Sequence, residues 1–101
     1  MRVLLSITRR VPAGEQAAYE GAWRRLRQAA GDAGVHAWRF RAAAASEPTP
    51  YLEFLEWRAD GSAPTASGSL AAALAELEDA FPGEGGMWHE VTGESLQEGG
   101  P

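Results

Sequence analysis

The 101-residue sequence contains no cysteine, no lysine and no asparagine. The lack of cysteine excludes disulfide bonds, thiolate metal sites and a cysteine nucleophile, and it fits a reducing compartment. All nine basic residues are arginines, and the formal net charge is −5. Because non-specific nucleic-acid binding depends on the neutralisation of phosphates, we expect no nucleic-acid partner for an acidic chain.

Long apolar runs are also missing. The apolar stretch at residues 3–7 ends at Thr8-Arg9-Arg10, which makes it too short for the hydrophobic region of a signal peptide. No run approaches the ~20 apolar residues that span a bilayer. We therefore expect a soluble, cytoplasmic protein without a membrane partner.

The composition is that of a folded protein, since 45% of the residues are apolar and four are tryptophans. The length allows one domain, which we place at residues 1–94. Residues 95–101 are polar and rich in glycine, and we expect them to form a flexible tail.

Apolar periodicity predicts four strands and two helices, separated by segments rich in proline, glycine and serine. The predicted strands are 2–11, 35–42, 51–58 and 87–92, and the predicted helices are 14–30 and 70–81. Ser69 is the expected cap of the second helix. Gly21 lies inside the first helix, where it can mark a close backbone approach.

The resulting order, βαββαβ, predicts an α+β protein of ferredoxin-like topology, with a four-stranded antiparallel sheet and two helices on one face. The two middle strands carry large apolar residues on both sides, among them Trp38, Phe40, Leu52 and Phe54. The helices can cover only one side, and an exposed apolar patch of that size is unfavourable in a monomer. We therefore expect a homodimer that forms through the open face of the sheet.

Three segments carry a family resemblance. Residues 7–15 run from a strand into a Pro/Gly turn and an acidic helix start, residues 19–23 bear aromatic side chains on the first helix, and residues 51–57 form a strand that ends in tryptophan. Together they resemble the dimeric α+β barrel superfamily, most closely its antibiotic-biosynthesis-monooxygenase-like (ABM-like) branch. The resemblance implies a cofactor-independent monooxygenase acting on a small aromatic, quinol or polyketide-type molecule.

The chain departs from the family pattern in three places. Leu55 stands two residues before Trp57, where relatives often have glutamate, and the predicted helix 70–81 lacks the histidine that many relatives carry. Relatives that degrade heme use an asparagine on the first strand, and this chain has none. Heme degradation in its usual form is therefore not implied, and we expect no cofactor.

The candidate catalytic residues are His36 and His89, because histidine is the side chain whose ordinary pKa lies near neutrality. Either could deprotonate a substrate in a cavity between helices and sheet, with Ser6 or Thr8 donating to the developing oxyanion. The expected lining of this cavity is aromatic: Trp38, Tyr51, Trp57 and Trp88. Each histidine could instead be an ordinary strand residue, and each aromatic residue a core or interface residue. Two histidines alone make an incomplete metal site, so we expect no metal.

Charged residues allow structural and functional interpretations. Glu53 and Glu56 are three apart on a strand and must face opposite sides of the sheet. Either could pair across strands with an arginine, of which the nearest candidates are Arg39, Arg41 and Arg58. The run Arg24-Arg25-x-Arg27 is a solvated helix face or a patch for an anion or a partner.

Two hypotheses about function remain open. One is a small-molecule oxygenase or isomerase with a histidine base. The other is a non-catalytic module that binds an aromatic or acyl ligand or only dimerises. The chemistry of the cavity and the positions of the two histidines discriminate between them.

Overall fold

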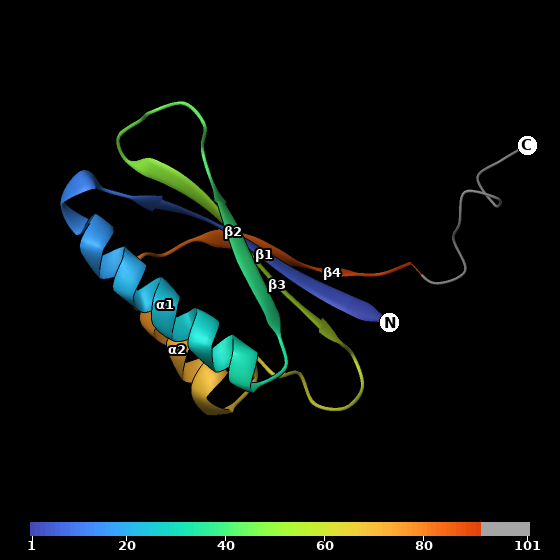
Figure 1. Ribbon diagram of the computed structural model, residues 1–101. Helices are drawn as coiled ribbons and strands as arrows, with labels where there is room; N and C mark the ends of the chain where they lie inside the picture. The colour runs from blue at the N-terminus through green and yellow to red at the C-terminus, as the bar shows by residue number, and fades with distance from the viewer. Residues whose placement is uncertain (92–101) are drawn as a thin grey trace, which may run out of the picture.

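The computed structural model describes residues 1–91, which form four strands and two α-helices in the order βαββαβ (Figure 1). The strands are β1 (Arg2–Val11), β2 (His36–Arg41), β3 (Thr49–Arg58) and β4 (Glu84–His89). The helices are α1 (Gln16–Asp32), preceded by a short 3-10 turn at Ala13–Glu15, and α2 (Gly68–Ala80). Thr92 and the predicted tail at residues 95–101 lie outside the described residues.

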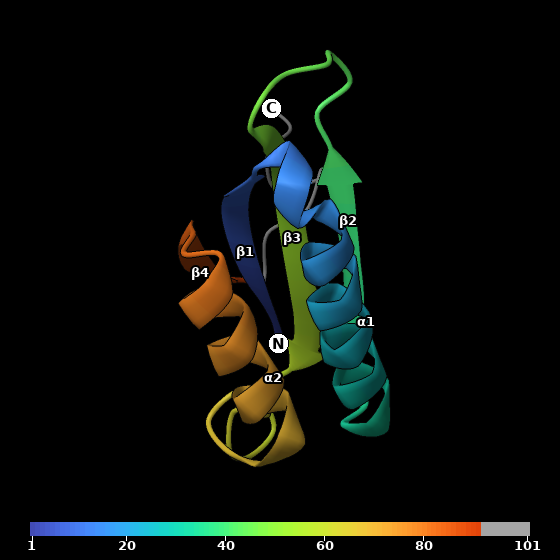
Figure 2. The same ribbon diagram turned by 90° about the vertical axis from the view of Figure 1, so that its left-hand side faces the viewer.

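The strands form one antiparallel sheet in the order β2-β3-β1-β4. Both helices lie side by side on one face of this sheet, and no element of residues 1–91 covers the other face, which we call the open face (Figures 1 and 2). This arrangement confirms the predicted ferredoxin-like α+β fold. Within residues 1–91, neither helix is both long and apolar enough to cross a membrane.

Several predicted boundaries need correction. The fourth strand starts at Glu84, three residues before the expected Met87, because Glu84-Gly85-Gly86 pairs with β1 without any apolar alternation. Glycine is required there, since a Cβ on Gly85 would collide with the backbone oxygen of Ser6. Helix α2 starts at Gly68 after Ser67, which makes no side-chain cap, so Ser69 is not the capping residue.

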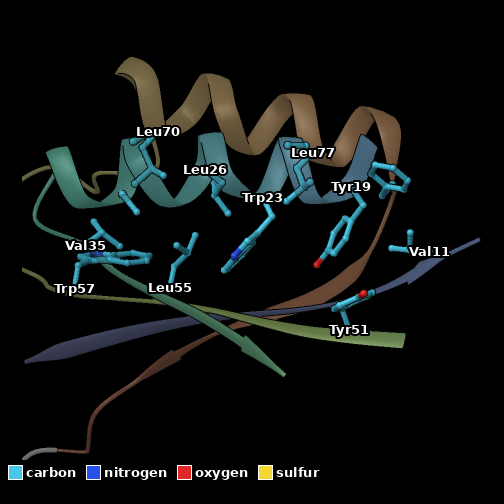
Figure 3. Packing of buried hydrophobic residues seen from close by; sticks show 14 of the residues in the cluster. Val11, Tyr19, Trp23, Leu26, Val35, Tyr51, Leu55, Trp57, Leu70 and Leu77 are labelled. Atoms are coloured by element: carbon cyan, nitrogen blue, oxygen red, sulfur yellow. The ribbon is translucent and has the colours of Figure 1, made fainter. Parts of the chain in front are cut away.

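The hydrophobic core fills the space between the helices and the sheet (Figure 3). Helix α1 supplies a stripe at helical spacing, namely Tyr19, Ala22, Trp23, Leu26, Ala29 and Ala30. Strand β3 supplies alternate residues, because successive side chains of a strand point to opposite faces. Gly21 is not at a close backbone approach, as the nearest atoms to an added Cβ belong to the flexible side chain of Arg25.

The open face of the sheet carries a band of aromatic side chains. The ring centroid of Trp38 lies 5.2 Å from that of Phe54 and 4.7 Å from that of His36. Phe40 packs edge-on against Phe54 at 6.0 Å and is 60% exposed. The predicted two-sided apolar character of the middle strands is therefore present, and no part of residues 1–91 covers the open side.

Candidate functional site

The eight residues selected from the sequence lie on both faces of the sheet. Directly paired residues of antiparallel strands point to the same side, so the registers assign each face. The open face carries His36, Trp38, Ser6, Thr8 and Trp88, whereas Tyr51 and Trp57 are buried on the helix-covered face. His89 pairs with Val3 on the outer strand β4 and is exposed.

The hypothesis drawn from the sequence required Ser6 and Thr8 to face a cavity between the helices and the sheet. Both residues lie on the opposite face of the sheet. Ser6 instead accepts a hydrogen bond from the indole Nε1 of Trp88 at 2.9 Å, on the open face. The alternation of side chains along β1 explains this position. The odd-numbered residues, such as Val3 and Val11, point toward the helices, so the even-numbered residues point to the open face.

A cluster of polar side chains lies within the core on the helix-covered face. Arg9 on β1 and Glu53 on β3 are 0% and 2% exposed, and their side chains meet with Nε to Oε1 at 2.8 Å. The hydroxyl of Tyr19, on α1, donates to the other oxygen of Glu53 at 2.6 Å. Figure 3 shows Tyr19 reaching down from α1 toward Tyr51 on the sheet.

Arg9 also joins the sheet to α2. Its Nη1 donates to the carboxylate of Glu78 at 2.8 Å and to the backbone oxygen of Phe81 at 2.7 Å. Its Nη2 is buried and has no partner among residues 1–91. Since buried charges are costly unless paired, this set of bonds is what makes an arginine acceptable in the core.

Arg39 on β2 lies next to this cluster, inside a cage of aromatic rings. Its guanidinium carbon is 5.3 Å from the ring centroid of Tyr19, 5.1 Å from that of Trp23 and 5.2 Å from that of Tyr51. These distances are within the range of cation–π attraction. Its Nη2 donates to Glu20 at 2.6 Å, while its buried Nη1 has no acceptor within the described residues.

Two side chains of this region have shifted pKa values. Burial raises the pKa of Tyr19 well above its ordinary value of about 10, and the adjacent carboxylate of Glu53 raises it further. Burial opposes the charge of Arg39, but Glu20 and the phenol of Tyr19 more than offset that effect, so the pKa of Arg39 is raised. Both groups thus keep their proton: Tyr19 is a neutral donor and Arg39 a permanent cation.

A surface groove between α1 and the edge strand β2 gives access to Arg39. We call it the α1–β2 groove; its volume is about 440 Å³. It is lined by Glu20, Trp23, Arg24, Arg27, His36, Ala37, Trp38 and Arg39. The groove thus brings together two of the residues selected from the sequence, His36 and Trp38, with three arginines.

A second depression, of about 560 Å³, lies at the end of the sheet and contains His36 and Trp57. Its charged residues are of both signs, and Arg2 and Glu56 among them lie 3.7 Å apart. The α1–β2 groove has two indole side chains and an excess of positive charge, so it is better suited to an aromatic ligand. His89 lines neither space. In residues 1–91, no group of three or more acidic, histidine or cysteine side chains could hold a metal ion.

Sequence reasoning did not select Arg9, Tyr19 or Arg39 as site residues. Glu53 was expected to pair with Arg39, Arg41 or Arg58, and Arg39 is indeed directly opposite it in the register. Both oxygens of Glu53 are nevertheless taken by other residues, one of them on α1. The one feature of the sequence that pointed to this cluster was Arg9, an arginine at a position of strand 2–11 whose side chain faces the helices.

No protein-family model matches the chain, and no characterised protein matches it by sequence. Among solved structures, it is similar to a mutant of SnoaB, a cofactor-independent oxygenase from Streptomyces nogalater, with a TM-score of 0.65 and 15% identity. That match covers 92% of this chain and 98% of SnoaB. A de novo designed protein, Ferredog-Diesel, matches with a TM-score of 0.54 and 12% identity, over 88% of this chain and 85% of its own. At these identities the likeness establishes a shared fold.

The first prediction concerns the buried ion pair. Glu53→Gln should lower the free energy of unfolding by about 3 kcal/mol, because it leaves the guanidinium of Arg9 buried without its carboxylate. Urea denaturation measures this loss. The matched control is Glu76→Gln, which breaks an exposed 2.8 Å pair with Arg25 and should change stability by less than about 1 kcal/mol. Equal effects of the two variants would contradict the assignment.

A second prediction concerns alkaline pH. In the unfolded chain Tyr19 ionises near pH 10, whereas in the folded chain its raised pKa keeps it neutral. Its contribution to stability is therefore complete below pH 10 and is lost as the pH rises beyond that value, by up to about 1.4 kcal/mol per pH unit. Urea titrations at pH 9 and pH 11.5 should show a shallower decline for Tyr19→Phe than for the wild type. If the free energy of unfolding declined equally in both proteins, Tyr19 would have the same pKa in the folded and the unfolded chain.

Proposed function

We propose that this protein is a cofactor-independent, monooxygenase-like enzyme that acts on a small aromatic molecule of the quinol or polyketide type in the α1–β2 groove. The observation that carries the proposal is the meeting, in one groove, of an imidazole, an exposed guanidinium group (that of Arg24 or Arg27) and two indole rings. These are a base, an anion-stabilising donor and a surface for an aromatic ring.

The groove residues have separate roles in the proposed reaction. His36 takes a proton from an activated carbon of the substrate, and the exposed guanidinium group of Arg24 or Arg27 stabilises the resulting enolate or phenolate. The electron-rich carbanion reduces O₂ directly, and loss of water from the hydroperoxide leaves a ketone. For an anthrone the balance is anthrone plus O₂ giving anthraquinone plus water, so neither metal nor flavin is needed.

Two further findings support this proposal. The chain shares its fold with SnoaB, which is itself a cofactor-independent oxygenase, over nearly the whole length of both chains. The sequence resemblance to ABM-like proteins, carried by residues 7–15, 19–23 and 51–57, points to the same chemistry by a separate route. Neither depends on the groove, and both reflect the same fold, since the three segments of the resemblance are elements of it.

The alternative is a non-catalytic module that binds a small ligand or only dimerises. The exposure of both histidines favours it, because a general base works best where water is excluded. His36 lines an open groove, and His89 is exposed on β4. The alternative predicts ligand binding without turnover.

Oxidation of anthrone tests the enzyme proposal. Anthraquinone formation and O₂ consumption should be measured together for the wild type, His36→Ala and His89→Ala. We expect His36→Ala to lower kcat by about 100-fold, which is the usual contribution of a general base, and His89→Ala to leave kcat unchanged. Loss of activity in His89→Ala alone would move the role of base to His89. Binding of anthrone without any O₂ consumption by the wild type would overturn the enzyme proposal in favour of the binding module.

We also propose that two copies pair through the open face of the sheet, as dimeric α+β barrels do. The supporting observation is the aromatic band formed by Trp38, Phe40 and Phe54, extended by the exposed Leu52 and Trp88. Exposed patches of this kind mark interaction surfaces. A second copy presents the same apolar band, so the pairing is self-complementary.

Light scattering tests the dimer. At micromolar concentration the wild type should have a mass about twice the 10.8 kDa of one chain. Phe54→Asp places a charge at the centre of the aromatic band and should give a folded monomer, since Phe54 does not belong to the core between helices and sheet. Ala72→Asp, on the exposed surface of α2, is the control and should remain dimeric. A monomeric wild type would contradict the proposal.

A further inference from the structure

The side chains on the open face form three rows that run across the sheet. Each row contains one residue from each of β2, β3, β1 and β4, because directly paired residues of antiparallel strands point to the same side. The rows are His36, Glu56, Leu4 and Trp88; then Trp38, Phe54, Ser6 and Gly86; then Phe40, Leu52, Thr8 and Glu84. A second copy that covers the open face must fit these rows.

The two halves of the open face differ in height. The β2–β3 half carries the aromatic band, whose rings pack against one another and stand above the sheet. In the middle row the β1–β4 half has only Ser6 and Gly86. The indole of Trp88 lies across this place, since its Nε1 donates to Ser6 at 2.9 Å and a Cβ added to Gly86 would lie 3.7 Å from the ring. The face therefore has a thick half, β2–β3, and a thin half, β1–β4.

Two copies related by a two-fold axis can stack their open faces in two ways, because the strands of packed sheets stay roughly aligned. An axis along the strands puts β2 over the partner's β4 and β3 over the partner's β1, so each thick half lies on a thin half. An axis across the strands puts every strand over its own copy and reverses the order of the rows. The thin halves, with Ser6 and Gly86, would then face each other across a gap. Since protein interiors are close-packed, the difference in height favours the axis along the strands.

The edge strands favour the same arrangement. Strands β3 and β4 are both antiparallel to β1, and β2 is antiparallel to β3, so β2 and β4 run in opposite directions. An axis along the strands keeps these directions and brings the free edge of β2 beside the free edge of the partner's β4. Unpaired backbone groups on two antiparallel edges can then meet, whereas exposed edges are unfavourable.

The arginines at one end of the open face oppose this arrangement only weakly. Arg2 and Arg58 are directly paired in the register and would lie near the partner's Arg58 and the partner's Arg2. Arg2 is exposed, however, and already contacts Glu56 at 3.7 Å and Glu90 at 3.4 Å. Interactions between exposed charges are screened by water, so they contribute less than the burial of the aromatic band.

We infer that the two copies pair about an axis along the strands, and that the partner's Trp88 lies against His36 and completes the wall of the α1–β2 groove. His36 and Trp88 stand in the same row, on the two strands that this axis places over each other. The inference rests on the proposed dimer. It goes further by naming the side chain that each copy contributes to the candidate site of the other.

Crosslinking tests the arrangement, and the lack of cysteine makes introduced cysteines selective. When His36→Cys and Trp88→Cys are co-expressed, a short bis-maleimide should link the two chains. The matched alternative is His36→Cys with Phe40→Cys, because an axis across the strands reverses the rows and would bring these two positions together. Linkage of the second pair in place of the first would overturn the inference. His36→Cys with Ala72→Cys, on the exposed surface of α2, is the control and should give no linked product.

Complementation between copies tests the contribution to the site. His36→Ala and Trp88→Ala should each be impaired in anthrone oxidation as homodimers. When the two are co-expressed, the rate should recover to about one quarter of the wild-type rate, because about half of the dimers are mixed and each mixed dimer has one site with both side chains. No recovery would place Trp88 in the site of its own copy and overturn the inference. Full activity of Trp88→Ala alone would also overturn it.

Failure of the inference is distinguishable from failure of the proposals above. A dimer in which position 36 is linked to position 40 would overturn the inference and support the dimer. A wild type that is monomeric in light scattering would overturn both. Linkage of position 36 to position 88 in a protein that does not oxidise anthrone would support the inference and overturn the enzyme proposal.

Discussion

The buried ion pair between Arg9 and Glu53 is the interaction on which the helix-covered side of the molecule depends. Two charges withdrawn from water must find partners, and here the further partners come from both helices. Tyr19 of α1 donates to the carboxylate, and the guanidinium bonds Glu78 and the backbone oxygen of Phe81 at the end of α2. One strand pair thereby fixes the positions of both helices over the sheet.

The geometry of Arg39 follows from that pair. In the register, Arg39 stands directly opposite Glu53 and would be its natural partner. Both carboxylate oxygens of Glu53 are already occupied, by Arg9 and by Tyr19, so Arg39 turns to Glu20 and packs among aromatic rings. The buried Nη1 of Arg39, which has no acceptor within residues 1–91, is thus a consequence of how the core charges are paired.

The fold could be predicted from the sequence and the candidate site could not, because the two depend on different kinds of contact. Strand and helix order depends on local periodicity, which a single sequence displays, and the alternation at 2–11 and the stripe from Tyr19 to Ala30 were interpreted correctly. The partners of Glu53 depend on diagonal contacts across strands and on a helix above them, which no local pattern reveals. Ser6 was assigned to the wrong face of the sheet because it was selected for its hydroxyl group. Its place in the alternation of β1 puts it on the open face.

The core is filled with side chains, so a ligand site must lie at its border. The edge strand β2 forms such a border. Between the helices and the centre of the sheet, side chains such as Tyr19, Leu26 and Leu55 are at most 2% exposed and leave no room for a substrate. Beside an edge strand, inward residues such as Arg39 and open-face residues such as Trp38 border the same space, since no further strand separates them. A second copy on the open face would approach this border from the Trp38 side and exclude water from it.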